Sequence, residues 1–385
     1  MDFSLTAEQT RLVSETRRFA ETQLGANLVD RDAAGALDAD DWQADWQACA
    51  RQGLLGLAVP TDYGGQGLDV MSTVLALEAV GYGCPDNGLT LGLNGQIWAV
   101  QEPLLAFGSE AQKKAFLPGL CDGRLIGAHG MTEPQSGSNA FALQTRAVRQ
   151  DDGYVLTGSK TYVGMAPACD LAIVFATTNP DHKHWGLTAF IVEASREGFR
   201  RAAHQHKMGT RTVPMGTLEL DACWVPTPNR LGPEGAGASI FQHAMEWERS
   251  FIFASHVGRM ARQLDECLAY AGEREVFGQT IDGFQSVSNR LADMRLRLET
   301  AQLLLYKAAW LKARGDHAAL EAALAKLHLS EAFMASSLDA IRIHGGRGYV
   351  SEAGVERDLR DSVGGVIYSG TSDIQRQLIL KLMKK

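Results

Sequence analysis

Apolar positions recur at helical spacing along the first part of the chain. Between Leu12 and Ala20 they fall on one side of a predicted helix, and Thr6 followed by Gln9 forms a capping box at its start. Further helices are predicted through residues 42–49, from Val70 to Ala79, and from Ser109 to the Pro118–Gly119 pair. The pattern therefore indicates a helical region that extends to about residue 122.

The pattern changes to short β runs between about residues 123 and 232. An Asp-Asp-Gly turn at 151–153 precedes the run Tyr154–Leu156, which is a strong signal for a hairpin. Leu171–Phe175 and Leu187–Val192 are apolar runs with the length of buried strands. Because no helical segment separates these strands, we expect an antiparallel barrel or sandwich.

Long helical patterns return at residue 238. They cover approximately residues 238–272, 284–314, 317–344 and 372–383, and glycines stand in the joins. Helices of this length with short connections predict a bundle. The expected fold is α+β, with an N-terminal helical domain (1–122), a middle antiparallel β-barrel domain (123–232) and a C-terminal four-helix bundle (233–385).

The overall composition is typical of a globular enzyme, with 385 residues of which 45% are hydrophobic and 21% charged. The net charge of −8 argues against nucleic acid as a partner. No apolar run reaches the roughly 20 residues that span a bilayer. The first residues also lack a signal-peptide pattern, so we expect a cytoplasmic protein with no membrane partner.

Cysteine and histidine spacing gives no sign of a metal site. The six cysteines are widely spaced without a Cys-x-x-Cys pair, which predicts buried thiols rather than disulfides or zinc ligands. The pairs His182/His184 and His204/His206 lack further ligands nearby in the sequence, so we expect no metal. No Gly-x-Gly-x-x-Gly follows a strand either, so a nucleotide cofactor would be held without a Rossmann fold.

Four sequence blocks stand apart from these general patterns. In chain order they are residues 131–139 (Met-Thr-Glu-Pro-Gln-Ser-Gly-Ser-Asn), residues 158–164 (Gly-Ser-Lys-Thr-Tyr-Val-Gly), residues 270–287, and residues 341–349 taken together with 368–375. Each block alone has an ordinary reading, such as a Gly/Ser turn, an aromatic residue in a strand or a solvated helix end. In this order, the four together resemble the acyl-CoA dehydrogenase family over nearly the whole chain.

The resemblance implies an FAD cofactor, because each block matches a segment that contacts the flavin or its nucleotide in that family. Closely spaced Gly and Ser let a backbone approach a flavin ring, and Arg donates two hydrogen bonds at once to a diphosphate. Relatives use the third block across a subunit boundary, which implies a homodimer or homotetramer. The implied FAD-binding residues are Met131, Thr132, Ser138, Tyr162, Val163, Arg274, Phe277, Gln285, Arg342, Gly345, Gly346, Thr371 and Asp373.

Ser369 occupies the position that carries the catalytic glutamate in most of the family, and a hydroxyl with no partner is too weak a base. Isovaleryl-CoA dehydrogenase and similar members keep their base at the position of Glu248. The resemblance therefore implies that Glu248 removes the α-proton of an acyl thioester while the β-hydride goes to flavin N5, with Ser138 and Arg249 at the substrate. Alternatively, Glu248 complements the dipole at the start of a helix.

Glu248, Gly164 and Ser369 together are most similar to the branch of the family that acts on carrier-protein-bound acyl or aminoacyl thioesters, including prolyl-carrier-protein dehydrogenases. We expect dehydrogenation of a tethered substrate in a biosynthetic pathway, with an electron-accepting flavoprotein or oxygen as the oxidant. The alternatives are a catabolic short- or branched-chain acyl-CoA dehydrogenase, a flavin monooxygenase on the same fold, and a non-catalytic scaffold. Candidate residues for the acyl pocket are Trp98, Gln101, Phe241 and Trp247.

Overall fold

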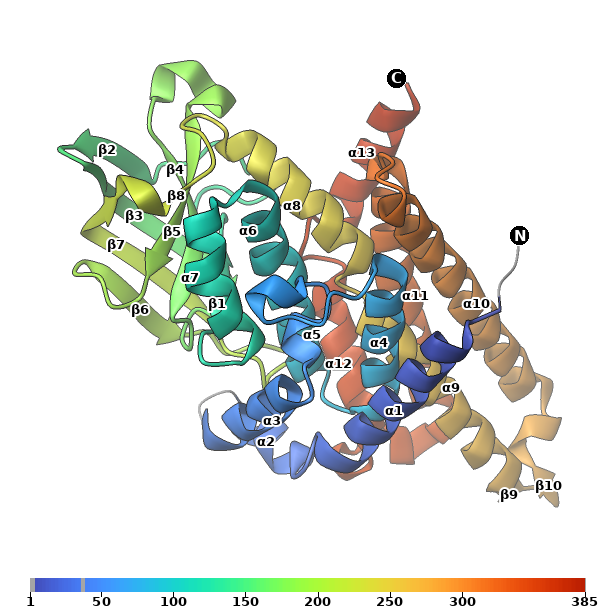
Figure 1. Cartoon of the computed structure of the whole chain (residues 1–385). Helices are drawn as coiled ribbons and strands as arrows, with labels where there is room; N and C mark the ends of the chain where they lie inside the picture. Colours follow the sequence, from blue (N-terminus) through green and yellow to red (C-terminus); the bar gives the residue numbers. More distant parts are fainter. Residues whose placement is uncertain (1–3, 36–38, 385) are drawn as a thin grey trace.

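The computed structural model describes residues 4–35 and 39–384. Figure 1 shows a β region on one side of the molecule and long helices on the other, with the shorter helices of the first part of the chain between them. Within the described residues, no helix is long and apolar enough to cross a membrane.

The first region is helical, as the periodicity predicts. Its helices are α1 (Ala7–Gln23), α2 (Leu28–Ala34), α3 (Ala39–Arg51), α4 (Val70–Gly83), α5 (Asn87–Gly95), α6 (Glu102–Phe107) and α7 (Glu110–Cys121), with a π-helical segment (Gln96–Gln101) between α5 and α6. The capping box is confirmed, because the Thr6 hydroxyl accepts from the Gln9 amide at 3.1 Å and the Gln9 side chain returns the bond. The predicted stop at Pro118 is wrong, since α7 continues past it and the burial of Leu120 and Cys121 holds the last turn.

The middle region is one sheet that combines two long strands, β3 and β7, with shorter ones. The strands are β1 (Gly127–Gly130), β2 (Arg146–Gln150), β3 (Gly153–Gly164), β4 (Leu171–Thr177), β5 (Leu187–Glu193), β6 (Phe199–His204), β7 (Met215–Pro226) and β8 (Arg230–Leu231). Their order is β6-β7-β3-β2-β4-β5-β8, with β1 beside β4. The predicted hairpin at 151–153 joins β2 to β3. The sheet is mixed rather than fully antiparallel, because the chain leaves β1, forms the β2–β3 hairpin and returns so that β4 runs parallel to β1.

The last region contains α8 (Gly237–Phe251), α9 (Ala254–Glu273), α10 (Gln285–Ala313), α11 (Ala319–His344), α12 (Val355–Gly365) and α13 (Ser372–Met383). A small hairpin of β9 (Glu275–Val276) and β10 (Gln279–Thr280) joins α9 to α10. Two details differ from the prediction. The helix expected over 238–272 is divided at Ile252 and Phe253, and α12 was not predicted.

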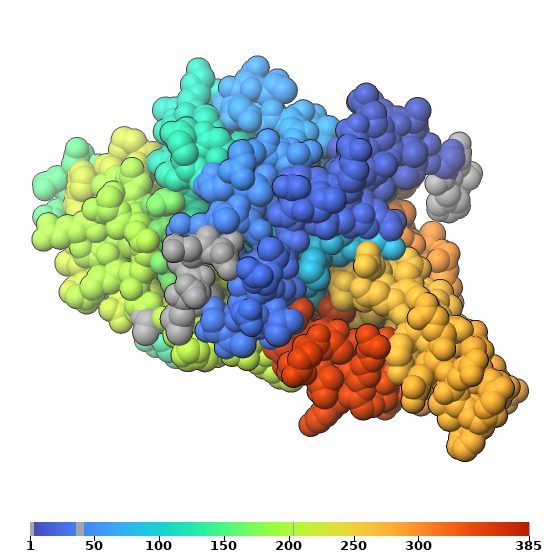
Figure 2. Space-filling view, turned by 90° about the horizontal axis from the view of Figure 1, so that it is seen from below, coloured from blue at the N-terminus to red at the C-terminus, as the bar shows by residue number. Residues whose placement is uncertain are grey.

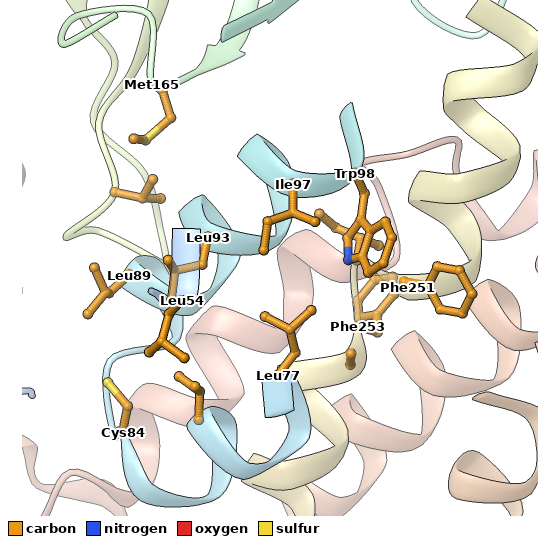
Figure 3. Close-up of a cluster of buried hydrophobic side chains, with 14 of the residues drawn as sticks. Leu54, Leu77, Cys84, Leu89, Leu93, Ile97, Trp98, Met165, Phe251 and Phe253 are labelled. Atoms are coloured by element: carbon orange, nitrogen blue, oxygen red, sulfur yellow. The ribbon is translucent and has the colours of Figure 1, made fainter. Parts of the chain in front are cut away.

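The core is continuous across these regions. Figure 3 shows one cluster that contains Leu77 and Leu93 of the first region, Met165, which follows β3, and Phe251 and Phe253 at the junction of α8 and α9. The six cysteines are all buried and unpaired, as their spacing predicts. Burial of these apolar groups in one cluster fixes the relative positions of the segments that surround the candidate site.

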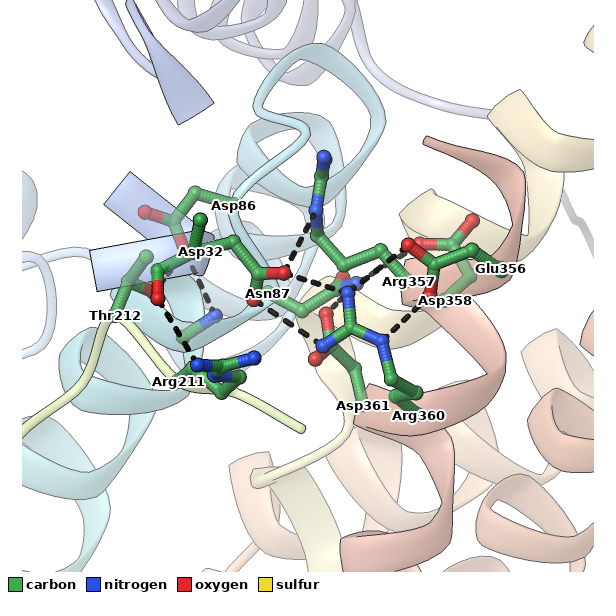
Figure 4. A network of polar contacts seen from close by, with 12 residues as sticks. Asp32, Asp86, Asn87, Arg211, Thr212, Glu356, Arg357, Asp358, Arg360 and Asp361 are labelled. Carbon is green, nitrogen blue, oxygen red and sulfur yellow. Dashed lines mark hydrogen bonds and ion pairs between the residues drawn. The ribbon is translucent and has the colours of Figure 1, made fainter. Parts of the chain in front are cut away.

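A buried polar network also joins the three regions (Figure 4). Asp86 accepts a hydrogen bond from the Thr212 hydroxyl at 2.5 Å, and Asn87 donates to Asp361 at 2.9 Å. The Thr210 amide donates to the same Asp361 carboxylate. Because buried polar groups need partners, this network holds the loop before β7 against both α5 and α12.

Candidate active site

A cavity of about 820 Å³ lies between the β region and the helices. Its walls include the loop after β1, the end of β3, one face of α5, the second half of α8 and the turn between α12 and α13. The predicted site residues that line it are Met131, Thr132, Ser138, Tyr162, Val163, Glu248, Arg249 and Thr371. Segments that are far apart in the sequence therefore meet around one space.

Glu248 lies in the last turn of α8 and lines this cavity. Its Oε1 accepts a hydrogen bond from the Ser369 hydroxyl. Burial raises the pKa of the Glu248 carboxyl, while the Ser369 hydrogen bond and the charge of Arg249 act in the opposite direction. The net effect is a carboxylate with a higher proton affinity than an exposed glutamate, which suits a general base.

The alternative reading of Glu248 as a charge at the start of a helix is wrong. Because the helix divides at Ile252 and Phe253, Glu248 is close to the C-terminal end of α8. The negative pole of the helix dipole lies at that end and disfavours a carboxylate. A placement that local helix energetics disfavour is typical of a functional position.

Ser369 is not a hydroxyl without a partner, contrary to the sequence-based description, because it donates to Glu248. Its φ of 56° lies in the left-handed region that residues other than glycine rarely adopt. The Ser369 carbonyl accepts hydrogen bonds from Arg249 Nε and from Gln375 Nε2, both at 3.2 Å. Side chains from α8 and α13 therefore hold this turn in place.

A buried ion pair connects the first two sequence blocks, and the sequence reading missed it. Lys160 Nζ lies 2.7 Å from Glu133 Oε1, and both side chains are almost fully buried. Glu133 also accepts from the backbone amides of Gln144 at 2.7 Å and Thr145 at 3.0 Å. The pair anchors the loop 131–138 to β3. The available signal was a single charged residue inside each of two segments whose other residues are uncharged.

The two segments predicted to contact a flavin lie side by side at the cavity. The Thr161 amide donates to the Thr132 carbonyl at 2.8 Å. Tyr162 has φ 55° and is 65% exposed, whereas the Val163 side chain is buried in the core. Gly164 lines the cavity, and a Cβ there would meet no atom within 4 Å. This wall therefore offers an aromatic ring, backbone groups and open space.

Other predicted FAD residues lie at the far end of the bundle, outside the cavity. Arg274 follows α9, Phe277 is 94% exposed between β9 and β10, and Gln285 begins α10. Figures 1 and 2 show this end as a projection away from the β region. One copy of the chain does not bring these three residues to Glu248.

The remaining predicted FAD residues are distributed between the surface and the cavity edge. Arg342 is exposed in the last turn of α11, and Gly345 and Gly346, which follow it, have open space where a Cβ would stand. Thr371 reaches the cavity, but its hydroxyl caps the start of α13. Asp373 is exposed in the first turn of α13. The structure does not bring this set together at one point.

Of the candidate pocket residues, Phe241 lines the cavity and the other three do not. The Trp98 and Trp247 rings stack with centroids 5.7 Å apart, and the Gln101 side chain donates to the Leu55 carbonyl at 2.8 Å. These three side chains therefore belong to the packing around the site.

Two further groups at the cavity had no recognisable signal in the sequence. His129 on β1 stacks on Phe241 at 6.1 Å, and burial lowers the pKa of this histidine to about 4, so its ring is neutral. Burial raises the pKa of Asp361 on α12 to about 7, against the effect of its hydrogen bond from Thr210. Distant residues create both environments, so the local sequence does not reveal them.

The residues at the cavity fit a flavin. Open space beside Gly164 gives a ring room to approach the backbone. The neighbouring Thr132 hydroxyl makes no hydrogen bond within the described residues and lines the same wall. A flavin edge carries carbonyls and ring nitrogens that need such donors. The open glycines at 345 and 346 similarly leave room for a close approach by a nucleotide.

Family profiles match the chain in three consecutive parts. The profile described as acyl-CoA dehydrogenase, N-terminal domain, matches residues 6–124. The middle-domain profile of the same family matches residues 128–223, and the C-terminal-domain profile matches residues 235–384. Together they cover the cavity walls and the far end of the bundle.

Individual relatives agree with these profiles. The L-prolyl-[peptidyl-carrier protein] dehydrogenase of Pseudomonas fluorescens is 44% identical over 340 residues, which cover 88% of this chain and 90% of that protein. The crystal structure of the prolyl acyl carrier protein oxidase AnaB has a TM-score of 0.96 and 43% identity, and the match covers 99% of this chain and 100% of AnaB. A structure of PigA with FAD and proline has a TM-score of 0.95 and 36% identity, over 100% and 99% of the two chains.

Proposed function

Since this chain belongs to the acyl-CoA dehydrogenase family, we propose that it dehydrogenates a carrier-protein-bound acyl thioester, with a prolyl thioester as the first candidate. The observation that carries the proposal is the enclosed Glu248 carboxylate, which lines one cavity together with both segments predicted to contact a flavin. The family and the fold class expected from the sequence are confirmed. The cofactor is FAD, which PigA also binds.

Glu248 is the general base in this proposal. Its Oε1 is engaged by the Ser369 hydroxyl, and its Oε2 makes no hydrogen bond within the described residues, so Oε2 is the oxygen that receives the α-proton. Because burial raises the pKa of the carboxyl, Glu248 is a stronger base than a solvated glutamate. The wall of Thr132, Tyr162 and Gly164 would hold the flavin of FAD, which would supply the acceptor for the hydride from the β-carbon. Loss of the proton and the hydride leaves a carbon–carbon double bond next to the thioester.

We assign the flavin ring to Thr132, Tyr162 and Gly164, and the nucleotide part to two surfaces. The first surface consists of Arg342, Gly345 and Gly346 at the end of α11, together with Thr371 and Asp373 at the start of α13. The second consists of Arg274, Phe277 and Gln285 from a neighbouring copy. The arrangement is compatible with the exposure of Phe277, whose ring is 94% exposed and therefore accessible to a neighbouring copy or a nucleotide. The assignment requires a homodimer or homotetramer.

Ser138 and Arg249 are the proposed substrate contacts, and both line the cavity. A carrier protein and CoA present the same pantetheine arm, so the cavity alone does not distinguish the two. The P. fluorescens relative and AnaB are both named for carrier-protein substrates, which favours a carrier protein for this chain. AnaB is also named an oxidase. Both oxygen and an electron-accepting flavoprotein are therefore candidates for the final oxidant, and both are to be tested.

Anaerobic mixing tests the proposal directly. The FAD-loaded protein is combined with a prolyl-loaded carrier protein, the unloaded carrier, prolyl-CoA, butyryl-CoA and isovaleryl-CoA, and flavin absorbance is followed. We expect fast bleaching by the prolyl carrier and none by the unloaded carrier. Bleaching by the acyl-CoA thioesters alone would instead support a catabolic acyl-CoA dehydrogenase. Absence of bleaching by every thioester would contradict a dehydrogenase and favour the monooxygenase.

A further inference from the structure

We propose that Ser369 is a positioning residue for Glu248, and that its hydroxyl fixes one carboxylate oxygen so that the other stays directed at the substrate. The inference rests on the proposed function of Glu248 as the base. It starts from the hydrogen bond between the two side chains, which lie 121 residues apart in the chain. Since the donor is fixed by tertiary contacts, the orientation of the carboxylate is fixed with it.

The backbone of Ser369 is held in an unfavourable conformation by several independent contacts. Its left-handed φ of 56° persists because Arg249 and Gln375 both donate to the Ser369 carbonyl. Gln375 also donates to the Gly370 carbonyl at 3.0 Å. At the other end of the turn, the buried Lys326 Nζ donates to the Gly365 carbonyl at 2.9 Å. Strain that several contacts maintain is typical of sites where geometry matters for function.

The hydroxyl has a second consequence beyond orientation. A hydrogen bond donated to a carboxylate stabilises its ionised form, and here it opposes the effect of burial on the Glu248 carboxyl. The groups that act on this carboxyl are Arg249 on the same helix, Lys326 on α11, and Ser369 and Tyr368 in the turn after α12. Ser369, Arg249 and Lys326 favour the ionised form. Among the described residues, only Ser369 donates a hydrogen bond to the Glu248 carboxylate.

Two substitutions at position 369 separate the effect of the hydroxyl from the effect of the strained backbone. Ser369→Ala removes the hydroxyl and keeps a side chain that disfavours positive φ. Ser369→Gly removes the hydroxyl and relieves the strain, because glycine adopts this conformation freely. We therefore expect Ser369→Gly to melt at a higher temperature than Ser369→Ala. Both variants lack the contact with Glu248, so we expect the same change in catalysis.

The readout is the pH dependence of flavin reduction by the substrate in the FAD-loaded protein. Loss of the hydrogen bond should raise the pKa of Glu248, and Glu248 must be ionised to act as the base. The acid limb of the profile of reduction rate against pH should therefore move to higher pH by roughly one pH unit in both variants. Above that limb, the rate should stay within about tenfold of the unmodified protein. Ser372→Ala is the matched control, because the Ser372 hydroxyl is buried without a hydrogen bond. It should leave the limb in place.

The outcomes separate this inference from the proposed function. An unchanged limb in both Ser369 variants overturns the positioning role. A limb that returns to its original position in Ser369→Gly also overturns it, since backbone strain would then be the cause. Glu248→Gln provides the independent reference. If Glu248→Gln reduces flavin at the normal rate, the assignment of Glu248 as the base fails. If Glu248→Gln loses flavin reduction while the acid limb is unchanged in both Ser369 variants, only the positioning role of Ser369 is refuted.

Discussion

The cavity and the far end of the bundle were both predicted to contact FAD, yet one copy of the chain builds them in different ways. At the cavity, Glu248, Ser369 and Thr132 come from three distant segments that buried polar contacts hold together. At the far end, Arg274 and Phe277 project from a short hairpin and are exposed. A single copy of the chain therefore encloses the proposed chemistry and leaves the proposed nucleotide contacts open.

The difference also sets the size of the effects that mutations should have. Removing the partner of a buried charge strongly destabilises the fold, because the remaining charge is left unpaired and without water. Removing the partner of an exposed charge changes the free energy of unfolding little, because water takes the place of the partner. Substitutions at the cavity should therefore act strongly and within one chain. Substitutions at the hairpin should act through FAD and the neighbouring copy.

Glu248→Gln should have the largest effect on catalysis. General-base catalysis contributes roughly 10²–10⁴ in rate, so we expect at least a hundredfold loss of substrate-dependent flavin reduction, measured by anaerobic stopped flow. FAD content and melting temperature should stay near those of the unmodified protein. Glu246→Gln is the matched control, because Glu246 pairs with Lys312 at the side of α8 and lies outside the cavity lining. Reduction at the normal rate in Glu248→Gln would remove this residue from the mechanism.

Lys160→Met should have the largest effect on stability, because it leaves Glu133 buried without its partner. Breaking a buried pair typically costs about 3–5 kcal/mol of unfolding free energy, which urea unfolding measures. The double variant Lys160→Met/Glu133→Gln should recover part of the loss. Arg295→Ala removes an exposed pair with Glu299 on α10 and should cost less than about 1 kcal/mol. Equal losses at both pairs would contradict the contrast between the enclosed and open regions.

The N-terminal cap and the β2–β3 hairpin could be predicted because their signals are local. The residues that make the Thr6 capping box lie within one turn, and the Asp-Asp-Gly turn lies directly between the strands that it joins. The order of helical, β and helical regions followed from the period of the apolar positions, which local backbone geometry sets.

The partners of the site residues could not be predicted, because they are determined by tertiary packing. Ser369 and Glu248 meet across 121 positions, and Lys160 and Glu133 across 27. The division of the predicted long helix at Ile252 and Phe253 has no Gly or Pro to mark it. Both residues are buried where α8 meets α9, so the demands of the core override the helical pattern there.

Arg274→Ala tests the open region. Hydrogen bonds to a charged group contribute about 1.5–3 kcal/mol, so the loss of a diphosphate contact should weaken FAD binding roughly tenfold to a hundredfold. Titration of the FAD-free protein with FAD measures this change, and light scattering reports the oligomeric state. Arg314→Ala is the control, because it removes an exposed arginine at the opposite end of α10. Unchanged FAD affinity in Arg274→Ala would show that the hairpin end does not hold the nucleotide.

Gly95→Ala should have the smallest effect, and it tests whether the space in the cavity is reserved for a ligand. Gly95 has helical φ and ψ, and a Cβ there would meet no atom within 4 Å. Alanine in a helix is favoured over glycine by about 0.5–1 kcal/mol, so the FAD-free protein should gain up to this amount in urea unfolding. Gly81→Ala is the contrasting control, because its Cβ would lie 1.7 Å from the Ser255 carbonyl oxygen and should destabilise the fold.

The same Gly95 substitution adds a methyl group to the part of the cavity wall formed by α5. If the space takes the acyl group, Gly95→Ala should raise the substrate concentration needed for half-maximal flavin reduction by a few fold, and Gly95→Leu by more than tenfold, which corresponds to about 1.4 kcal/mol. FAD content should be unchanged in the alanine variant. Greater stability together with weaker substrate binding would show that the missing side chain leaves room for substrate. Unchanged substrate binding in Gly95→Leu would place the acyl group elsewhere in the cavity.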